Sequence, residues 1–445
     1  MRREERRGGL TAARWLARLA VLAAAGVLAV LVVALGSGGL VIVVSGLVGL
    51  AVCGVGVWWF LAYRGVIRFA GAAVAVAAPL AVLSLFTADG LWLLALLLAL
   101  CWAVTLACAR AALRRARPPQ RSRRARRVPA VFRPRHPVLI MNPRSGGGKV
   151  GRFGLVERAE ALGARVILLD PSAPADVAAL AREAVAQGAD LLGVAGGDGT
   201  QALVAAVAAE HDVPFLVVSA GTRNHFALDL GLDRADPARC LDALTDGEEL
   251  RVDLGVVAGR AFVNTVSFGV YADVVQRPEY RDAKAGTALG LLPDLLIGDS
   301  VRRLDGHADG TLLTSQQALL VSNNPYASSD ALGATGRRPR LDSGTLGVLG
   351  IRVESAAQAA ALAVRGSQSA GLTVLTARRV EVTSELPEIP VAVDGEALRM
   401  PTPVVCTLRP RALRVLLPRH RTPATLPAPR VDWRGVLRLA FARTP

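Results

Sequence analysis

Three short segments of the chain combine glycine with residues that can hold phosphate. They are Asn142–Lys149 (Asn-Pro-Arg-Ser-Gly-Gly-Gly-Lys), Gly196–Thr200 (Gly-Gly-Asp-Gly-Thr) and Gly221–Ala227 (Gly-Thr-Arg-Asn-His-Phe-Ala). Each precedes a helical pattern, and the free backbone N–H groups at the start of a helix bind anions. Asp198 lies between glycines, where it suits Mg²⁺ carried by a nucleotide, because magnesium commonly takes one or two carboxylates plus phosphate oxygens. An ordinary Asp-Gly turn would explain Asp198 alone, but not all three segments.

The first segment resembles two familiar phosphate-binding motifs without fitting either. Residues 146–151 match the dinucleotide fingerprint G-x-G-x-x-G, and Asp170 follows at the distance of a ribose-binding acid. However, four residues, Pro143 among them, separate the preceding strand from the first glycine. A P-loop fails because Val150 follows Lys149 where Ser or Thr should stand. Lys149 is one of two lysines among 52 basic residues, which hints at a phosphate contact.

The elements around these segments alternate between strand and helix. The patterns predict strands at Val138–Met141, Arg165–Leu169, Leu191–Ala195 and Val213–Val218, and helices at Gly151–Leu162, Pro174–Gln187 and Thr200–Ala209. Repeated β–α–β units give a parallel, doubly wound sheet with helices on both faces. The three glycine segments follow strands of that sheet, so they should share its carboxyl edge, where open α/β sheets bind ligands.

A second, mostly antiparallel domain follows. β-like segments are Arg251–Val257, Ala261–Val266, Ala318–Ser322, Leu346–Val353, Val374–Thr383, Val391–Val393 and Val404–Val415. Tyr280–Ile297 is predicted as a partly helical insertion. Asp394-Gly395-Glu396 follows a strand, so Glu396 can project toward an interdomain cleft. By itself this tripeptide would be taken for a surface hairpin.

Five motifs in order resemble the diacylglycerol kinase catalytic family, which includes bacterial soluble lipid kinases and sphingosine kinases. They are Asn-Pro-Arg-Ser-Gly (142–146), Gly-Gly-Asp-Gly-Thr (196–200), Gly-Thr-Arg-Asn (221–224), Phe262-x-Asn264-x-x-Ser267-x-Gly269 and Asp394-Gly395-Glu396. The resemblance covers about Pro137–Leu416. It implies an α/β nucleotide-binding domain followed by a β-sandwich-like domain, with a lipid hydroxyl reaching the cleft between them.

The resemblance and the residue chemistry together give a predicted site. The ATP-binding residues are Asn142, Pro143, Arg144, Ser145, Gly146, Lys149, Gly196, Gly197, Gly199, Thr200 and Thr222. The catalytic residues are Asp198 and Glu396, with Glu396 as the general base that the resemblance implies. Metal contacts are Asp198 and, by the resemblance, a structural magnesium near Asp342. Phosphoryl transfer needs these parts: cradled phosphates, Mg²⁺ and a deprotonated acceptor hydroxyl.

The chain departs from the family pattern in two places. After Thr200 the family continues with an apolar residue, Asn or His, and then Glu, whereas Gln201, Ala202 and Leu203 stand here. A polar contact beside the nucleotide is therefore expected to be missing. His225 occupies a place where Asp is common, and it is given no proton-transfer role.

The first quarter of the chain has the composition of a membrane region. Four uncharged apolar runs, about Leu19–Leu35, Leu40–Ala62, Phe69–Phe86 and Leu91–Ala109, each approach the roughly 20 residues that cross a bilayer. Arginines flank both ends of the region and its middle loop, while the other two loops have none. The positive-inside rule therefore places the N-terminus and everything after residue 110 in the cytoplasm of a bacterial, multi-pass membrane protein.

The predicted organisation has five parts. Residues 1–110 carry four transmembrane helices, 111–136 form a basic juxtamembrane linker, 137–250 the ATP-binding domain, 251–416 a mostly β lipid-substrate domain, and 417–445 a Pro-rich tail. The arginines of 110–135 either contact anionic headgroups or only fix topology. The tail's short amphipathic segment, Trp433–Phe441, could lie on the membrane, but docking on its own domain is the favoured prediction.

Charge and cysteines exclude other classes. The net charge is +16, and residues 1–136 account for all of it with 19 arginines against three acids. The remainder is neutral, so a basic body that wraps nucleic acid is excluded. A hydrophobic content of 52% excludes disorder as the main class. The five cysteines have no zinc-type spacing and suggest a reducing compartment.

These observations predict a membrane-bound kinase that transfers the γ-phosphoryl group of Mg·ATP to a lipid hydroxyl, with diacylglycerol as the leading substrate. Two alternatives stay open. An NAD kinase also carries a Gly-Gly-Asp-Gly motif, although the Asn-Pro-Arg-Ser-Gly segment and the membrane region speak against it. A kinase-like protein without turnover would sense ATP or lipid instead, and Asp198 and Glu396 speak against that.

Overall fold

The structure is a computed structural model of the chain. It describes residues 2–36, 39–62, 66–88, 92–116, 133–170, 172–173, 175–272, 303–326, 337–355, 358, 362, 369–421 and 433–441. The predicted insertion Tyr280–Ile297 and most of the basic linker lie outside these residues. The chain divides into a membrane unit, 1–121 with 427–445, and a catalytic unit, 122–426.

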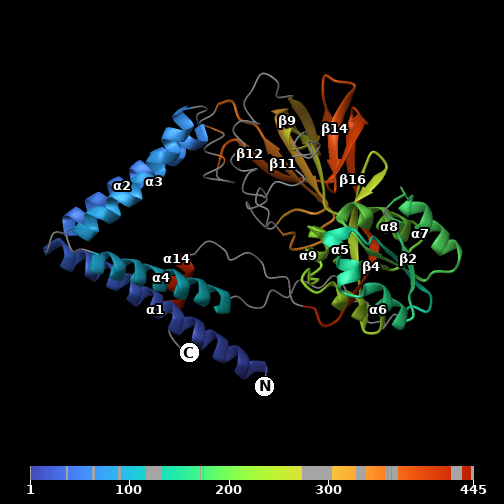
Figure 1. Cartoon of the computed structure of the whole chain (residues 1–445), viewed down its shortest axis with the longest axis horizontal. Helices are drawn as coiled ribbons and strands as arrows, with labels where there is room; N and C mark the ends of the chain where they lie inside the picture. The colour runs from blue at the N-terminus through green and yellow to red at the C-terminus, as the bar shows by residue number, and fades with distance from the viewer. Residues whose placement is uncertain are drawn as a thin grey trace. The chain divides into compact units, whose positions relative to one another are not determined.

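Four long helices make up most of the membrane unit (Figure 1). They are α1 (Arg2–Gly36), α2 (Gly39–Ala62), α3 (Val66–Ala88) and α4 (Trp92–Ala116). α1, α3 and α4 contain stretches long and apolar enough to cross a membrane, and α2 contains the shorter apolar stretch Val44–Phe60. Large apolar side chains are exposed along these helices, among them Leu22 and Phe69 at 67% and 75%. Such surfaces need an apolar solvent, so the helices support membrane association.

The helices pack in pairs, α1 with α4 and α2 with α3. The second pair approaches through glycine. A Cβ added to Gly56 would lie 2.5 Å from the backbone nitrogen of Ala75, and one added to Gly71 would lie 2.6 Å from that of Phe60. In a membrane the hydrophobic effect does not drive helices together, so helices associate by close packing, which small residues permit.

The tail ends in a short helix, α14 (Trp433–Phe441), and its docking differs from the prediction. Val436 and Ala440 are buried with Ala17 and Ala20 of α1 and with Ala109 and Ala112 of α4. The tail helix therefore docks on the membrane unit. The prediction that the tail docks on the domain it follows was wrong. The surface that binds α14 is formed by small residues of α1 and α4, which are distant from the tail in sequence.

The catalytic unit begins with the α/β domain. Its strands are β1 (Pro137–Met141), β2 (Arg165–Leu168), β3 (Leu191–Ala195) and β4 (Phe215–Val218). Its helices are α5 (Ser145–Arg152), α6 (Leu155–Ala161), α7 (Val177–Ala186), α8 (Asp198–Glu210), α9 (His225–Asp229) and the 3₁₀ helix η1 (Pro237–Leu244). The strands pair in parallel in the order β2-β1-β3-β4, as the alternation predicted.

The remaining strands form the second domain. They are β5 (Gly247–Val257), β6 (Arg260–Phe262), β7 (Thr265–Gly269), β8 (Leu304–Ala308), β9 (Thr311–Gln316), β10 (Ala318–Ser322), β11 (Leu346–Ile351), β12 (Leu372–Ala377), β13 (Arg379–Thr383), β14 (Glu388–Val393), β15 (Glu396–Pro401) and β16 (Val404–Pro418). One sheet has the antiparallel order β12-β11-β10-β7-β14-β15. The other continues the parallel sheet, because β16 pairs in parallel with β4 and antiparallel with β5 and β13.

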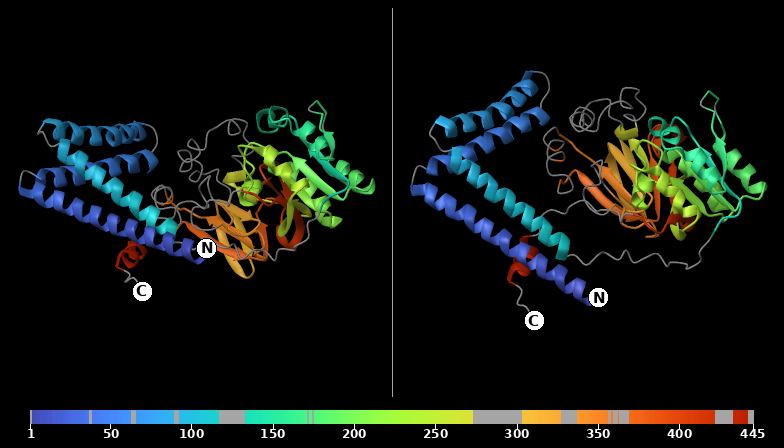
Figure 2. Two further views of the ribbon diagram at one scale, coloured as in Figure 1. Left: turned by 90° about the horizontal axis from the view of Figure 1, so that it is seen from below. Right: turned by 60° about the horizontal axis from the view of Figure 1, so that its bottom comes forward.

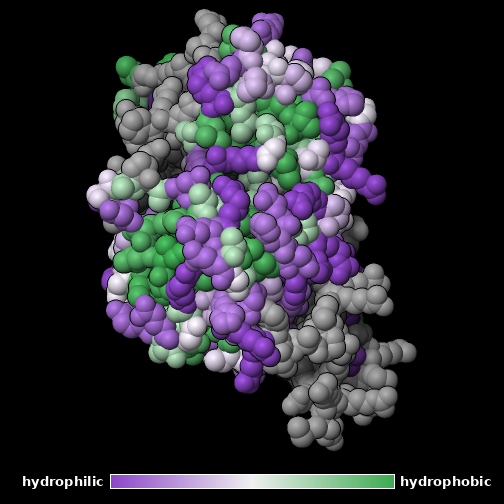
Figure 3. All heavy atoms as spheres, turned by 90° about the vertical axis from the view of Figure 1, so that its right-hand side faces the viewer, coloured by the Kyte–Doolittle hydropathy of each residue, from purple (hydrophilic) through white to green (hydrophobic). Residues whose placement is uncertain are grey.

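Two hydrophobic cores correspond to the two domains. One lies around β1, β3, β4 and their helices, and it also takes in Leu413 and Val415–Leu417 of β16. The other lies between strands of the two sheets and contains Phe262 and Phe268. Figures 1 and 2 show the α/β helices gathered beside the parallel strands and the antiparallel strands stacked next to them. On the face shown in Figure 3, hydrophilic side chains are spread between apolar areas, as on a water-exposed surface.

Three predicted elements are divided in the structure. The helix predicted over Gly151–Leu162 is interrupted at Gly154, whose φ of 54° is left-handed, so that residues 151–152 end α5 and α6 begins at Leu155. The strand predicted over Ala261–Val266 breaks between β6 and β7, where Asp394 takes up the backbone N–H groups. Val374–Thr383 divides into β12 and β13, which belong to different sheets. Apolar alternation continues across such breaks, so the pattern does not reveal them.

Candidate functional site

The three glycine segments meet at the carboxyl edge of the parallel strands. A Cβ on Gly146 would overlap the carbonyl oxygen of Ala220, and one on Gly221 would lie 2.7 Å from the Cα of Gly197. The first turn therefore contacts the third, and the third contacts the second, with no room for side chains between them. Glycine at these points permits backbone-to-backbone contact between the turns.

The first turn is built from left-handed glycines. Gly146, Gly147 and Gly148 have φ values of 57°, 70° and 80°, which residues with a Cβ rarely adopt. The Asn142 side chain accepts a hydrogen bond from the backbone N–H of Arg144 at 3.0 Å and closes the turn. Lys149 donates to the carbonyl of Arg234 at 2.8 Å. Partial burial, with the charge of Arg234, lowers the pKa of Lys149.

Asp198 joins the second turn to the third. It is nearly buried, and its carboxylate accepts the backbone N–H groups of His225 at 3.1 Å and Phe226 at 3.4 Å. It thus holds the first residues of α9. Burial lowers the pKa of His225, so the neutral imidazole is favoured beside the carboxylate. Nothing in this geometry requires His225 to move a proton.

Gln201 supplies a buried polar contact that sequence reasoning missed. Its Nε2 donates to the carbonyl of Gly196 at 3.0 Å and to Oδ1 of Asn224 at 3.3 Å, and Asn224 in turn donates to Gly221. The family has Asn or His at the position of Ala202. Gln201, one residue earlier, therefore supplies part of the polar contact that was expected to be missing. The signal was a glutamine in an otherwise apolar helical stretch, where a buried amide needs partners.

The Asp394-Gly395-Glu396 segment is the turn of the β14–β15 hairpin. Val393 pairs with Glu396, and the two residues between them have φ values of 49° and 87°. Positive φ at both central positions is the signature of a type I′ turn, which Asp-Gly favours. The Asp394 carboxylate accepts the N–H groups of Val263, Asn264 and Thr265 at 2.8–2.9 Å. The hairpin is thereby fixed to the stretch between β6 and β7.

Burial raises the pKa of Asp394 to about 7, while its backbone hydrogen bonds oppose the rise and the charge of Asp198 adds to it. The second turn and the hairpin are thus close enough to interact electrostatically. Two carboxylates near one another resist simultaneous ionisation.

Glu396 lies directly against the second turn. A Cβ on Gly199 would overlap its Oε1, so only glycine leaves room for this carboxylate. Its Oε2 is bonded to Nη2 of Arg260 on β6. The ion pair fixes the position of this carboxylate, which is the group predicted as the general base. Arg260 was not predicted; its position two residues before Phe262 in the fourth motif is the signal that could have found it.

A buried ion pair joins the α/β domain to the second domain. Nε of Arg338 donates to Asp229 of α9 at 2.7 Å, and both side chains are almost inaccessible, at 1% and 4%. The same guanidinium donates to the carbonyls of Val263 and Asn323 and to Oδ1 of Asn264. Arg338 was missed because no periodicity marks it. It connects the helix that follows the third turn with the stretch fixed by Asp394.

The two residues predicted to hold metal, Asp198 and Asp342, have different partners. Oδ1 of Asp342 is paired with Arg340 at 3.0 Å, and the charge of Asp342 helps to raise the pKa of Asp253, which is raised mainly by burial. Within the described residues, no three His, Cys, Asp or Glu side chains gather as a metal cage. Asp198 fits a single carboxylate contact to Mg²⁺ whose other ligands are phosphate oxygens. The magnesium assignment at Asp342 stays a prediction.

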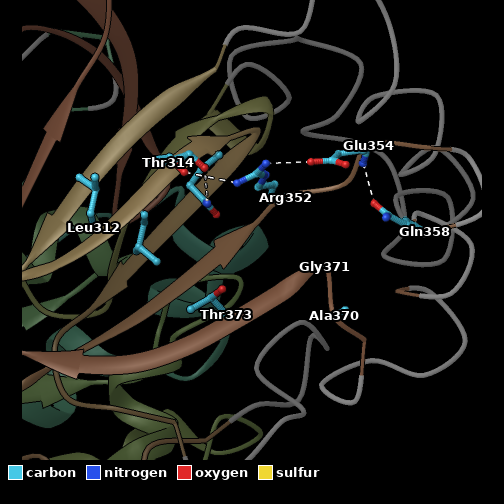
Figure 4. A pocket seen from close by; sticks show the side chains of 10 residues that line it. Leu312, Thr314, Arg352, Glu354, Gln358, Ala370, Gly371 and Thr373 are labelled. Atoms are coloured by element: carbon cyan, nitrogen blue, oxygen red, sulfur yellow. Dashed lines mark hydrogen bonds and ion pairs between the residues drawn. The ribbon is translucent and has the colours of Figure 1, made fainter.

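A cavity of about 370 Å³ lies elsewhere on the second domain (Figure 4). Arg352 crosses it and bonds to Thr314 at 3.3 Å and to Glu354 at 2.8 Å, while Gln358 accepts from the Glu354 backbone. These polar groups satisfy one another. The predicted site residues are not among those lining this cavity.

Comparison with known proteins identifies the family of the chain. Residues 136–257 match the diacylglycerol kinase catalytic domain. A protein of Pseudomonas fluorescens described as "Probable lipid kinase YegS-like" is 30% identical over 264 residues, covering 55% of this chain and 82% of that protein. This chain belongs to the diacylglycerol kinase catalytic family. Its lipid-kinase-like domains follow an apolar helical region.

Two further relatives of the family match over shorter stretches. Diacylglycerol kinases of Mycobacterium tuberculosis and Bacillus subtilis are each 32% identical, over 120 and 164 residues. These matches span 39% and 53% of the relatives' lengths, and 26% and 36% of this chain. A solved structure of a candidate diacylglycerol kinase from Bacillus anthracis has a TM-score of 0.52 at 20% identity, covering 66% of this chain and 100% of that one. It supports the shared fold.

Proposed function

We propose that the protein is a membrane-bound lipid kinase that transfers the γ-phosphoryl group of ATP to the hydroxyl of a membrane lipid, diacylglycerol in the first place. Membership of the family supports a lipid-kinase-like enzyme, and ATP is the co-substrate that the family implies. The observation that carries the proposal is the contact between Glu396 and Gly199, which places a carboxylate beside the glycine turns.

In this proposal the glycine turns bind the nucleotide. Backbone amides of Asn142–Gly146 and Gly196–Thr200 would hold the phosphates, with Thr222 and Lys149 at the rim. Mg²⁺ would be held by Asp198 together with phosphate oxygens, and when bound it neutralises charge on the transferring group. Glu396 would accept the proton of the lipid hydroxyl through Oε1, while Arg260 holds Oε2.

The membrane unit keeps such an enzyme at its substrate. We infer that α1–α4 cross a bacterial membrane with the N-terminus and the catalytic unit in the cytoplasm, because the arginines collect at those ends. The arginines between 110 and 135 would contact anionic headgroups. An enzyme acting on a soluble acceptor would have no need for this arrangement.

The test is transfer of label from γ-labelled ATP into a chloroform extract of membranes that contain the full chain. The wild type is compared with Asp198→Asn and Glu396→Gln. A labelled lipid made by the wild type, and reduced at least about 100-fold in both variants, is expected if these carboxylates carry the reaction. The mobility of the product identifies the acceptor.

Other outcomes point elsewhere. Tight ATP binding without a labelled lipid would contradict catalysis on native lipids and favour a sensor. Formation of NADP from NAD would favour an NAD kinase. A labelled lipid that both variants make at the wild-type rate would show that the carboxylates are misassigned while the lipid kinase activity stands.

A further inference from the structure

The tail helix α14 has two apolar faces, and only one of them is covered within the membrane unit. Val436 and Ala440 are buried against α1 and α4, whereas Trp433, Leu437 and Phe441 are exposed at 41%, 47% and 73%. Each set is spaced by four residues, which places its members on one side of a helix. Trp433, Leu437 and Phe441 are called the outer face here.

The position of α14 suggests what covers the outer face. Its partners on α1, Ala17 and Ala20, lie within the candidate span Ala12–Val30, and Ala109 and Ala112 lie near the end of the span Leu96–Leu113. Figures 1 and 2 both show α14 beside α1 and α4. The helix therefore rests on two membrane-spanning helices close to where their apolar stretches end.

A charged side chain lies where α14 docks on α1. Arg18 lies within the contact and donates through Nε to the carbonyl of Ala440 at 3.2 Å, which satisfies one of the last carbonyls of α14. Its guanidinium also stacks on the ring of Trp15, 5.4 Å from the centroid. Arginine and tryptophan together are typical of the boundary between acyl chains and headgroups.

The order of residues around α14 fits that boundary. At about 100° per residue, the docked face is followed by the outer face and then by the positions of Arg434 and Arg438. A helix docked on one side, apolar on the next and basic beyond it can lie along a bilayer surface, with its apolar arc toward acyl chains and its arginines toward headgroups.

We propose that the outer face of α14 is inserted into the acyl–headgroup boundary of the bilayer beside α1 and α4. The occupant of this face is lipid. The catalytic unit is then held at the membrane at both of its ends, because the chain leaves the membrane unit after α4 and returns to it at α14. This arrangement is independent of the proposed kinase activity.

Photo-crosslinking in the full chain tests the proposal. The chain is placed in vesicles of phosphatidylethanolamine and phosphatidylglycerol, with Phe441 replaced by the similarly sized benzoyl-phenylalanine. The control carries the same probe at Leu168, which is 54% exposed on β2 of the catalytic unit. After irradiation, we expect at least a tenfold larger yield of phospholipid adduct at 441 than at 168, measured by mass spectrometry.

Each other result overturns the proposal. Adducts from 441 to peptides of the catalytic unit would mean that the face is covered within the chain, and adducts between two chains would mean a dimer. Equal lipid adducts at both positions, or no adduct at 441, would equally contradict insertion. As a second measurement, Leu437→Ser with Phe441→Ser should speed tryptic cleavage at Arg438 at least about tenfold, and an unchanged rate would contradict insertion as well.

Discussion

The three glycine turns and the Asp394–Glu396 hairpin lie in contact, but different interactions hold them there. The turns follow neighbouring parallel strands and meet through backbone contacts, as between Gly146 and Ala220 or Gly221 and Gly197. The hairpin comes from the other domain and is held by charged groups: Asp394 on three backbone amides, and Glu396 on Arg260. The proposed phosphate-binding part is therefore local and made of backbone, whereas the proposed proton-accepting part depends on long-range ion pairs and hydrogen bonds.

The largest effect should come from removing the proposed base. Glu396→Gln should lower turnover by about 10²–10⁴-fold, because a general base contributes about that much, while ATP affinity changes little. Glu388→Gln is the matched control, since Glu388 lies on the same hairpin and pairs with exposed Arg399. Turnover and ATP binding are measured separately. A parallel loss of ATP affinity would show that Glu396 belongs to the phosphate-binding part.

Breaking the buried pair behind the site should cost stability. Arg338→Met leaves Asp229 buried and unpaired, so the free energy of unfolding should fall by about 3–5 kcal/mol. Arg352→Met, in an exposed pair with Glu354, should cost less than about 1 kcal/mol. Pulse proteolysis of the full chain in detergent, across a urea series, measures both.

The double variant Arg338→Met/Asp229→Leu sharpens this test. It removes both charges, so it should recover part of the loss. If the double variant is as unstable as the sum of both single variants, the pair is not coupled as the structure indicates.

Filling the contact between two turns should have a smaller effect. Gly221→Ala would place a Cβ 2.5 Å from Oδ1 of Asn224 and close to the backbone of Gly197, so the turns must separate. We expect a loss of about 1–3 kcal/mol in stability, as for other overpacked sites, and weaker ATP binding. Gly151→Ala is the control, because its Cβ would meet nothing within 4 Å. Equal ATP affinities in the two variants would contradict the close packing of the turns.

The smallest effect is a pH dependence at the hairpin. Because the pKa of Asp394 is raised to about 7 in the folded chain, from an ordinary 3.8, folding favours its protonated form. Its contribution to stability is complete below the ordinary pKa and is lost as pH rises through about 7. Between pH 6 and pH 8 the loss should be about 1 kcal/mol, and Asp394→Asn should not show it.

His225 changes stability in the opposite direction. Burial lowers its pKa from 6.5, so its contribution is present above that pH and is lost as pH falls. Because both proteins contain His225, subtracting the free energy of unfolding of Asp394→Asn from that of the wild type removes the contribution of His225. If the difference between Asp394→Asn and wild type does not change from pH 6 to pH 8, the raised pKa is wrong.

Much of the fold could be predicted from the sequence because it follows from local patterns. The apolar runs of α1–α4 and the alternation of strands and helices from Pro137 to Val218 are periodic over many residues. Strand breaks at Val263 and between β12 and β13 could not be predicted, because they arise from Asp394 and from a change of sheet. The position of α14 also depended on alanines that are far away in sequence.

The glycine turns and the Asp-Gly hairpin were determined by the sequence itself. Their backbone conformations require glycine or aspartate at particular positions, and parallel strands bring their carboxyl ends to one edge. The tertiary structure alone decided that Arg260 bonds to Glu396, that Arg338 joins Asp229 to Asn264, and that Gln201 binds Asn224. Such pairs join residues from separate elements, and their partners become specific only when burial removes water as the competing hydrogen-bond partner.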